Sequence, residues 1–371
     1  MPPRSDPLGG PAAWAADEHD APARARRLGV SVEAVELVAS SDVVDLHVES
    51  FIWTRVFGYD LARWHQPPLS GGRLWGQADL PRLFAAGLDA PVMSIATNPL
   101  RTARGRRRVA LANLARLRTT LAAAGVVVVA DVPAYRAARA AGQRAAFLAL
   151  QGGHALAPGD LGRPEVADVS RITLVHLTRS RLGSSSAPGG RDRGLTAEGA
   201  RMVEALRAHG VLLDLAHASR RTFDEALAVH RDGPLAVTHT GVAALRPSWR
   251  NLDDEQIRAV AGRGGVVGVI HHRGFLTRPG WRASAADVVA HLAHVVAVGG
   301  EATAAWGSDT DGAILPPRDL ASVLALPRLV QSMLDAGFGP ERVRAVLGGN
   351  ALRCLADVRA GAGSATRRPQ A

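Results

Sequence analysis

Three apolar segments of the chain end in histidine, and a fourth ends in aspartate. The segments are VVDLHVES (43–50), VLLDLAHAS (211–219), LAVTHTG (235–241) and AAWGSDTDG (304–312). An apolar run that stops at such a residue places a metal ligand or a base at the carboxyl edge of a parallel sheet, where barrel enzymes carry their chemistry. Neutral imidazoles and carboxylates bind Zn²⁺ and similar ions, and a bound ion activates water and polarises a carbonyl. The pattern predicts a metal-hydrolase centre.

Five side chains at these positions are the candidate ligands and acid–base groups. His47 and Glu49 lie two residues apart, so they share one face of the first strand. His217, His239 and Asp309 end the other three segments. Any one of the histidines alone fits a structural role better than a ligand role. Their common position at strand ends favours one shared site.

The elements that must position these residues alternate along the chain. Short, continuously apolar runs are typical of strands buried on both faces, and helical patterns such as 195–210 and 284–300 lie between most of them. The second of these begins at a predicted cap, Ser284, with Asp287 three residues on. The strand-like runs are 43–48, 91–97, 145–151, 172–178, 211–217, 235–240, 266–272 and 304–309.

Eight strands alternating with helices predict a single α/β domain, a (β/α)8 TIM barrel. One apolar run, 126–131, is left over and is interpreted as an insertion or an extra edge strand. A doubly wound open sheet is the alternative. It is disfavoured because no glycine-rich phosphate loop follows the first strand.

Composition is consistent with one large domain. The chain has 371 residues, 47% of them hydrophobic, and we assign the barrel to 29–360, with flexible segments at 1–28 and 361–371. The net charge of +10 comes from arginine alone, since the chain has no lysine. The arginines are scattered, and their densest cluster, 103–118, fits one face of an amphipathic helix. No nucleic-acid-binding module accompanies them, so coding bias explains the charge better than a polyanion surface.

Targeting and redox signals are sparse. Cys354 is the one cysteine, which excludes an internal disulfide. The first residues lack the apolar segment of a secretory signal, and no apolar stretch reaches the length of a membrane span. We therefore expect a cytoplasmic protein that acts on a small molecule, without nucleic-acid or membrane partners, and leave a homodimer open.

From about Val43 to about Leu355 the chain resembles the membrane (renal-type) dipeptidase family, peptidase family M19, of the amidohydrolase-like barrels. The order and spacing of several motifs together make the resemblance specific. The matching stretches are DLHVES (45–50), QGGHAL (151–156), ITLVHLT (172–178), 194–219, 236–269, GSDTDG (307–312) and VLGGNALR (346–353).

The resemblance implies a role for each matching residue. His47 and Glu49 correspond to ligands of a first metal, His217 and His239 to ligands of a second, and position 151 to a carboxylate that bridges the two. His176 corresponds to the residue that binds substrate and stabilises the oxyanion. Arg250 corresponds to the anchor of the substrate carboxylate, and Asp309 to the acid–base aspartate.

Two positions depart from the family pattern. Glu49 stands where aspartate is usual, which keeps the charge and adds a methylene. Gln151 stands where the family has the bridging glutamate. An amide offers one neutral oxygen, and its NH₂ group does not ligate. Two divalent ions, Glu49, Asp309 and a bridging hydroxide leave one uncompensated positive charge without a glutamate at 151. We therefore expect one tightly held Zn²⁺ and a second site that is weak or empty.

These residues lead to a metallodipeptidase as the first hypothesis, with activity weakened by Gln151. Two alternatives stay open. One is a mononuclear amidohydrolase that acts on a different amide or a lactam. The other is a catalytically silent pseudo-dipeptidase that binds small ligands. The retained His47, His176, His217, His239, Arg250 and Asp309 argue against complete loss of activity.

Overall fold

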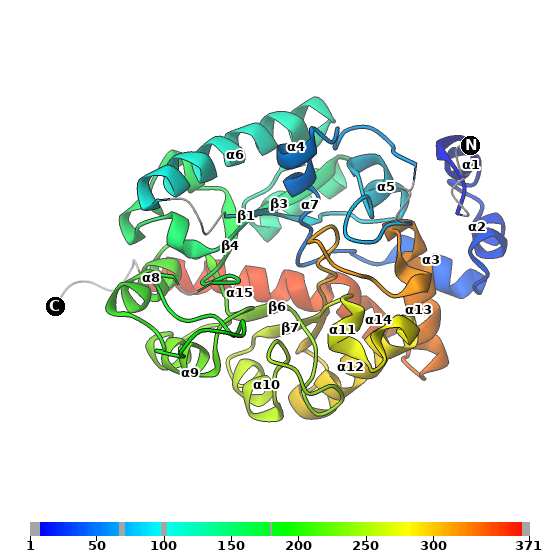
Figure 1. Cartoon of the computed structure of the whole chain (residues 1–371). Helices are drawn as coiled ribbons and strands as arrows, with labels where there is room; N and C mark the ends of the chain where they lie inside the picture. The colour runs from blue at the N-terminus through cyan, green and yellow to red at the C-terminus, as the bar shows by residue number, and fades with distance from the viewer. Residues whose placement is uncertain (1–7, 67–70, 98–101, 179, 366–371) are drawn as a thin grey trace.

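The computed structural model describes residues 8–66, 71–97, 102–178 and 180–365. Its centre is a parallel sheet surrounded by helices (Figure 1). The strands follow the order β1-β3-β4-β5-β6-β7-β8, and β2 pairs with β3 at the edge. The leftover run at 126–131 is thus an extra edge strand. The strands are β1 (Val92–Ala96), β2 (Val126–Val128), β3 (Arg144–Gln151), β4 (Val169–Thr173), β5 (Leu212–Asp214), β6 (Ala236–Thr240), β7 (Val266–Val269) and β8 (Ala304–Trp306).

The predicted first strand, 43–48, closes the barrel between β1 and β8. Leu46 donates its backbone N–H to Trp306, and Val48 donates to Val92, each at 3.1 Å. The segment is not a regular strand, because the buried Asp45 carboxylate accepts the backbone N–H groups of His47 at 3.0 Å and Ser308 at 2.9 Å. Such side-chain acceptors compete with ladder hydrogen bonds. The (β/α)8 architecture is confirmed, with an irregular first strand.

Several strands end earlier than the apolar runs predict. β4, β5 and β8 each stop three residues before the functional candidate, so His176, His217 and Asp309 lie in loops above the sheet. His217 and Asp309 have φ angles of 66° and 61°, in the left-handed region that interrupts a strand. The apolar runs therefore locate the correct edge of the sheet but overestimate the strand lengths.

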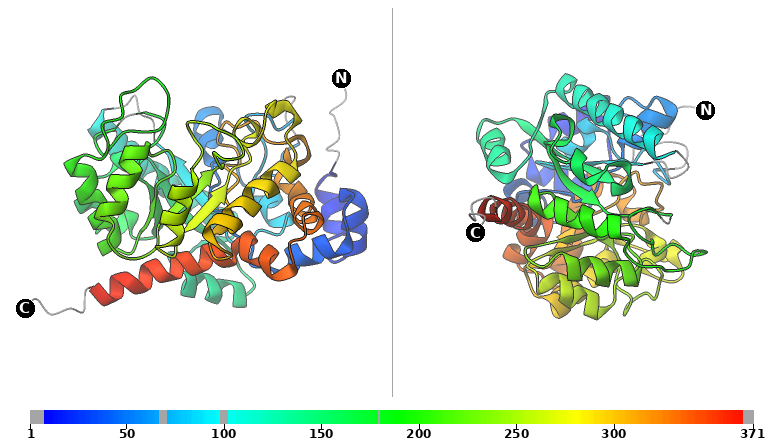
Figure 2. Two further views of the ribbon diagram at one scale, coloured as in Figure 1. Left: turned by 90° about the horizontal axis from the view of Figure 1, so that it is seen from below. Right: turned by 90° about the vertical axis from the view of Figure 1, so that its left-hand side faces the viewer.

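Helices surround the barrel, and α15 runs across its base (Figure 2). The predicted helices at 195–210 and 284–300 are α8 and α12, and α12 begins with the expected Ser284–Asp287 capping box. The helix bounds are α1 (Pro11–Ala16), α2 (Ala21–Leu28), α3 (Val32–Ser40), α4 (Phe51–Phe57), α5 (Leu80–Ala85), α6 (Ala103–Ala123), α7 (Val132–Ala140), α8 (Ala197–Ala208), α9 (Arg220–Val229), α10 (Asp254–Ala261), α11 (Arg273–Leu276), α12 (Ala285–Gly299), α13 (Leu326–Asp335), α14 (Pro340–Arg344) and α15 (Asn350–Ala365).

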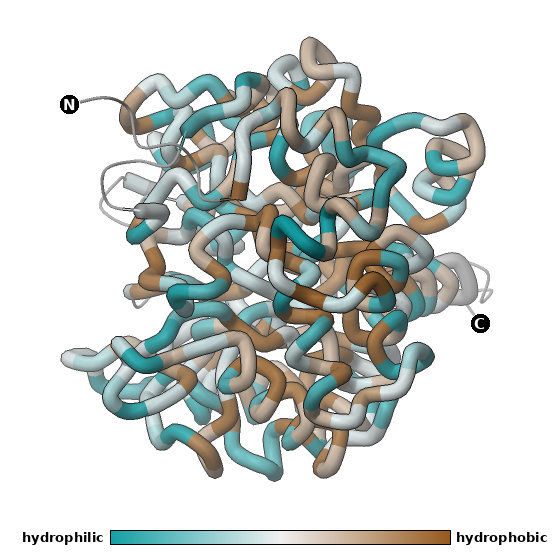
Figure 3. Tube along the Cα trace, turned by 90° about the vertical axis from the view of Figure 1, so that its right-hand side faces the viewer, coloured by the Kyte–Doolittle hydropathy of each residue, from teal (hydrophilic) through white to brown (hydrophobic). Residues whose placement is uncertain are grey.

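The apolar core has two parts, which follow from the alternation of side chains along each strand. A larger cluster includes Leu148 and Leu150 of β3 together with apolar residues of the surrounding helices. A smaller one includes Phe147 of β3, Leu212 of β5 and Leu355 of α15. Hydrophobic and hydrophilic stretches accordingly alternate along the trace (Figure 3).

Helices occupy parts of both terminal segments, 1–28 and 361–371. Residues 8–28 contain α1 and α2, with Trp14 and Leu28 buried in the core, and Trp14 Nε1 donates to the Leu8 carbonyl at 2.8 Å. At the other end α15 continues to Ala365. The remainder of the two predicted extensions, 1–7 and 366–371, lies outside the described residues. Among the described residues, no helix has the length and apolarity needed to cross a membrane.

Candidate metal centre

Gln151, His217 and His239 form a compact triangle at the carboxyl edge of the sheet. The Nε2 atoms of His217 and His239 are 3.0 Å apart, and the amide nitrogen of Gln151 lies 3.2 and 3.3 Å from them. Two nitrogens bound to one tetrahedral Zn²⁺ at their usual bond lengths are about 3.3 Å apart. The triangle therefore has the dimensions of one face of a zinc site, and the amide of Gln151 supplies its oxygen when it is turned over.

The proton of His239 is placed by a chain of buried hydrogen bonds. Thr238 donates its hydroxyl proton to Asp214 Oδ2 at 2.7 Å. Because that proton is engaged, Thr238 Oγ1 acts as the acceptor in its 2.9 Å contact with His239 Nδ1. The Nδ1 atom of His239 therefore carries the proton, and its Nε2 lone pair faces the triangle. This is the tautomer that a metal ligand needs.

The charge state of the triangle also suits a metal. Burial lowers the pKa values of His217 and His239 well below that of a free imidazole, because a low-dielectric interior disfavours the charged ring. Both rings are neutral at physiological pH. Neutral imidazole is the form that coordinates zinc.

His47, Glu49 and Asp309 make a second, adjoining group. His47 Nε2 lies 3.2 Å from Glu49 Oε1 and 3.7 Å from Asp309 Oδ1, and the His47 ring packs on His239 with centroids 3.9 Å apart. Burial lowers the pKa of His47. Burial and the nearby Glu49 carboxylate raise the pKa of Asp309 well above that of an ordinary aspartate, so Asp309 is suited to carry a proton.

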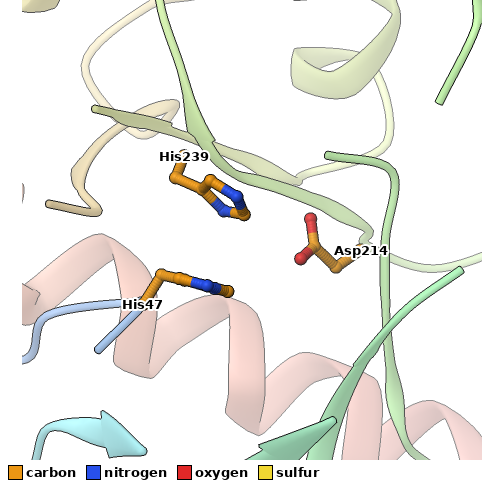
Figure 4. Close-up of side chains that lie close together, drawn as sticks. All are labelled: His47, Asp214 and His239. Carbon is orange, nitrogen blue, oxygen red and sulfur yellow. The ribbon is translucent and has the colours of Figure 1, made fainter. Parts of the chain in front are cut away.

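Asp214 also lies near the two histidines, within a 4.8 Å grouping with His47 and His239 (Figure 4). This carboxylate has no free ligand position, however. Its Oδ1 accepts the backbone N–H groups of Ala216 and Thr238, each at 3.0 Å. Its Oδ2 accepts from Arg171, Thr173 and Thr238 at 2.6–2.7 Å. Asp214 therefore organises the ligands, and the triangle with Gln151 is the better metal site.

His176 and Arg250 flank the triangle. The His176 ring meets the His217 ring edge-on, with centroids 4.7 Å apart. Desolvation of the ring by the surrounding protein lowers the pKa of His176 to about 4. Arg250 is 4% exposed and donates from Nη2 to the His239 carbonyl at 2.5 Å. Burial lowers the pKa of Arg250 to about 10, so its guanidinium remains charged at neutral pH. A neutral donor and a cation thus lie next to the candidate ligands.

The sequence reasoning named the residues of this edge but not those beneath it. Arg171, Asp214 and Thr238 are all at most 1% exposed and connect His47 to His239. The sequence does contain a signal for these buried residues, because a charged residue inside an apolar strand needs a buried partner. Asp214 lies in the middle of VLLDLAH, and Arg171 directly precedes ITLVHLT.

Comparison with known proteins identifies the family to which this chain belongs. The family described as "Membrane dipeptidase (Peptidase family M19)" matches residues 32–368. The chain belongs to peptidase family M19. Its fold is accordingly that of a TIM-barrel metallopeptidase, and its class is that of the dipeptidase-type, metal-dependent hydrolases.

The chain is also similar to individual proteins. Dipeptidase aclJ of Aspergillus oryzae is 28% identical over 333 residues, covering 85% of this chain and 78% of the relative. An uncharacterized protein in the pqqA 5′ region of Klebsiella pneumoniae is 36% identical over 187 residues, covering 48% of this chain and 68% of the relative. A metallopeptidase of Rhodobacter sphaeroides, solved with a phosphinate mimic of the dipeptide L-Ala-D-Ala, is 25% identical with a TM-score of 0.76. That match covers 86% of this chain and 99% of the other.

Proposed function

We propose that this M19 hydrolase cleaves dipeptides with free carboxyl termini, using one Zn²⁺ held by His217, His239 and Gln151. The observation that carries the proposal is the ligand triangle, whose edges of 3.0–3.3 Å match a tetrahedral zinc site. A zinc ion at this position supplies Lewis acidity and activates water. The Rhodobacter relative, solved with a dipeptide mimic, supports a dipeptide as the substrate class.

The surrounding residues divide the remaining tasks. Arg250 holds the substrate carboxylate, because a buried guanidinium pairs with both oxygens of a carboxylate. His176, neutral at working pH, donates to the oxyanion that develops on the scissile carbonyl. Asp309, whose carboxyl retains its proton more strongly than an ordinary aspartate, delivers that proton to the leaving amine.

The test is hydrolysis of a dipeptide panel by zinc-loaded protein, with release of free amino acids as the readout. L-Ala-D-Ala and several L,L-dipeptides are compared with their C-terminal amides and with small lactams. We expect the free-carboxylate dipeptides to be cleaved best and the His239→Gln variant to be inactive. Preferential lactam opening would establish the amidohydrolase alternative instead, and binding without turnover would establish the silent pseudo-dipeptidase.

The identity of the metal, the cellular location, the oligomeric state and the domain limits also belong to this proposal. Zinc fits a site with two nitrogen ligands and one oxygen ligand. A cytoplasmic location, a homodimeric state and the domain limits at 29 and 360 stay predictions from the sequence. Size-exclusion chromatography with light scattering tests the homodimer, and a chain lacking residues 1–28 tests the proximal domain limit.

A further inference from the structure

Arg171 lies directly beneath the candidate metal centre and reaches two of its components. The side chain is 1% exposed and extends from β4. Its Nη1 donates to Asp214 Oδ2 and to Thr173 Oγ1, each at 2.7 Å. Its Nη2 lies 2.9 Å from Nδ1 of His47. A guanidinium is thus held against an imidazole nitrogen in the barrel interior.

The contact with His47 determines where that imidazole carries its proton. Arginine has N–H donors and no acceptor, and it stays protonated in proteins. An Arg171 N–H directed at Nδ1 of His47 therefore requires a lone pair on Nδ1. A neutral imidazole has one proton, so the proton of His47 is on Nε2. That atom lies 3.2 Å from Glu49 Oε1, and no hydrogen bond joins the two atoms in this structure.

His47 and His239 consequently carry their protons on opposite ring nitrogens. Thr238 accepts a hydrogen bond from the Nδ1–H of His239, which leaves a lone pair on His239 Nε2. Arg171 donates to Nδ1 of His47 and leaves its Nε2 as an N–H. Both settings originate in Asp214, which accepts from Arg171 and from Thr238. One buried carboxylate thereby makes one histidine a ligand and the other a donor.

We propose that Arg171 is a positioning residue that fixes His47 as an Nε2–H donor and withdraws it from metal binding. The centre then has one metal, because a metal at Glu49 and Asp309 would have to bind there without a nitrogen ligand or convert His47 to an imidazolate. The buried guanidinium of Arg171 instead supplies a fixed positive charge that interacts electrostatically with the Glu49 carboxylate. The proposal rests on the proposed metal site and adds a reason, independent of Gln151, for a single ion.

The direct test is ¹⁵N NMR of the imidazole nitrogens in metal-free protein labelled at histidine, with His47 assigned by loss of its signals in His47→Gln. We expect His47 to show a protonated Nε2 and an unprotonated Nδ1, and His239 to show the reverse. A protonated Nδ1 on His47 would overturn the proposal. This measurement uses the unmodified chain, so it does not depend on the folding of an Arg171 variant.

Metal content gives a second readout. After dialysis with excess Zn²⁺ and removal of free ion, His47→Gln should keep one zinc per chain with a dissociation constant within about threefold of the unmodified protein. His239→Gln should lose the zinc. If His47→Gln loses zinc as completely as His239→Gln does, His47 is a ligand and the proposal is wrong.

The Arg171 variants test the cause. Gln151→Glu alone should still bind one zinc, whereas Gln151→Glu combined with Arg171→Met should bind two, because His47 is then free to present its Nε2 lone pair. The matched control is Arg82→Met, which also removes a fully buried arginine, one paired with Asp79 away from the site. It should leave zinc content at one. Two zinc ions in Gln151→Glu alone would contradict the role of Arg171, and if the double variant does not fold, the NMR and His47→Gln results decide.

Failure of this inference is distinguishable from failure of the proposed function. Dipeptide turnover by a protein whose His47 carries its proton on Nδ1 would retain the function and reject the role of Arg171. The opposite result, an Nε2–H on His47 and one zinc in a protein that cleaves no dipeptide, would retain the role of Arg171 and reject the function.

Discussion

Replacing Thr238 with valine should weaken zinc binding by about 10- to 100-fold without unfolding the protein. The change removes the oxygen that accepts from His239 Nδ1 at 2.9 Å and donates to Asp214 at 2.7 Å. Asp214 keeps its other four donors, so we expect to lose about 1–2 kcal/mol of stability. Without an acceptor for its buried Nδ1–H, His239 favours the other tautomer, in which the proton is on Nε2, the ligating atom. Loss of such an orienting partner typically costs 10- to 100-fold in metal affinity, about 1.4–2.7 kcal/mol.

The assay is competition for zinc against a chromophoric chelator, with thermal unfolding of the metal-free protein measured in parallel. Thr240→Val is the matched control, since Thr240 is equally buried two residues along β6 and donates to the carbonyls of Gly241 and Arg250. It should cost similar stability and leave zinc affinity unchanged. A zinc affinity for Thr238→Val within twofold of the unmodified protein would refute the reasoning on the His239 proton.

Four further predictions follow from the same geometry. Gln151→Glu should tighten the one bound zinc by about tenfold, since charge-assisted contacts are roughly twice as strong as neutral ones; an unchanged dissociation constant would exclude Gln151 as a ligand. Arg250→Ala should raise KM for free-carboxylate dipeptides by about 10- to 100-fold with zinc retained. Arg250→Lys should restore little of the lost affinity, because a point charge does not pair with both carboxylate oxygens. Equal KM values for dipeptides and their C-terminal amides in the unmodified enzyme would count against Arg250 as the carboxylate anchor. Asp309→Asn should lower kcat by about 10²- to 10⁴-fold with zinc retained, and steady-state rates near the unmodified value would remove Asp309 from the acid–base role. Burial lowers the pKa of His271 to about 3, so the unfolded chain takes up a proton there as pH falls from about 6.5, and stability should decrease as pH falls from about 6.5 to about 3. Trp306 Nε1 donates to His271 Nε2 at 3.1 Å, and His271→Gln keeps an acceptor for it. This variant should flatten the dependence of stability on pH in thermal melts, and an unchanged slope would contradict the prediction.

The sequence predicts which candidate side chains lie together better than it predicts the elements around them. The positions of His217, His239 and Gln151 at one edge follow from apolar runs that end at the same level of a parallel sheet. Strand lengths do not follow from apolarity, because the residues directly after β5, Leu215 and Ala216, are also buried and apolar. Positive φ angles at His217 and Asp309 exclude strand geometry at these two residues, and the apolar pattern does not indicate them.

The missed elements have two physical causes. The α1 and α2 helices have only 6 and 8 residues, too few for an apolar pattern to identify them, although Asp20 caps α2 by accepting from the Ala23 N–H at 2.8 Å. The network of Arg171, Asp214 and His47 depends on which side chains of different strands meet inside the barrel. The register between β3 and β4 shifts at Leu148, and a shift of this kind decides which charges pair and cannot be derived from one strand at a time.

The most direct test of the whole account is a zinc titration of dipeptide hydrolysis in metal-free protein. Because His217, His239 and Gln151 form one complete ligand set and His47 is held as a donor, activity should rise linearly with added zinc and reach its plateau at one equivalent per chain. A plateau at two equivalents would contradict the single-metal centre. Absence of hydrolysis at any zinc concentration would contradict the dipeptidase function.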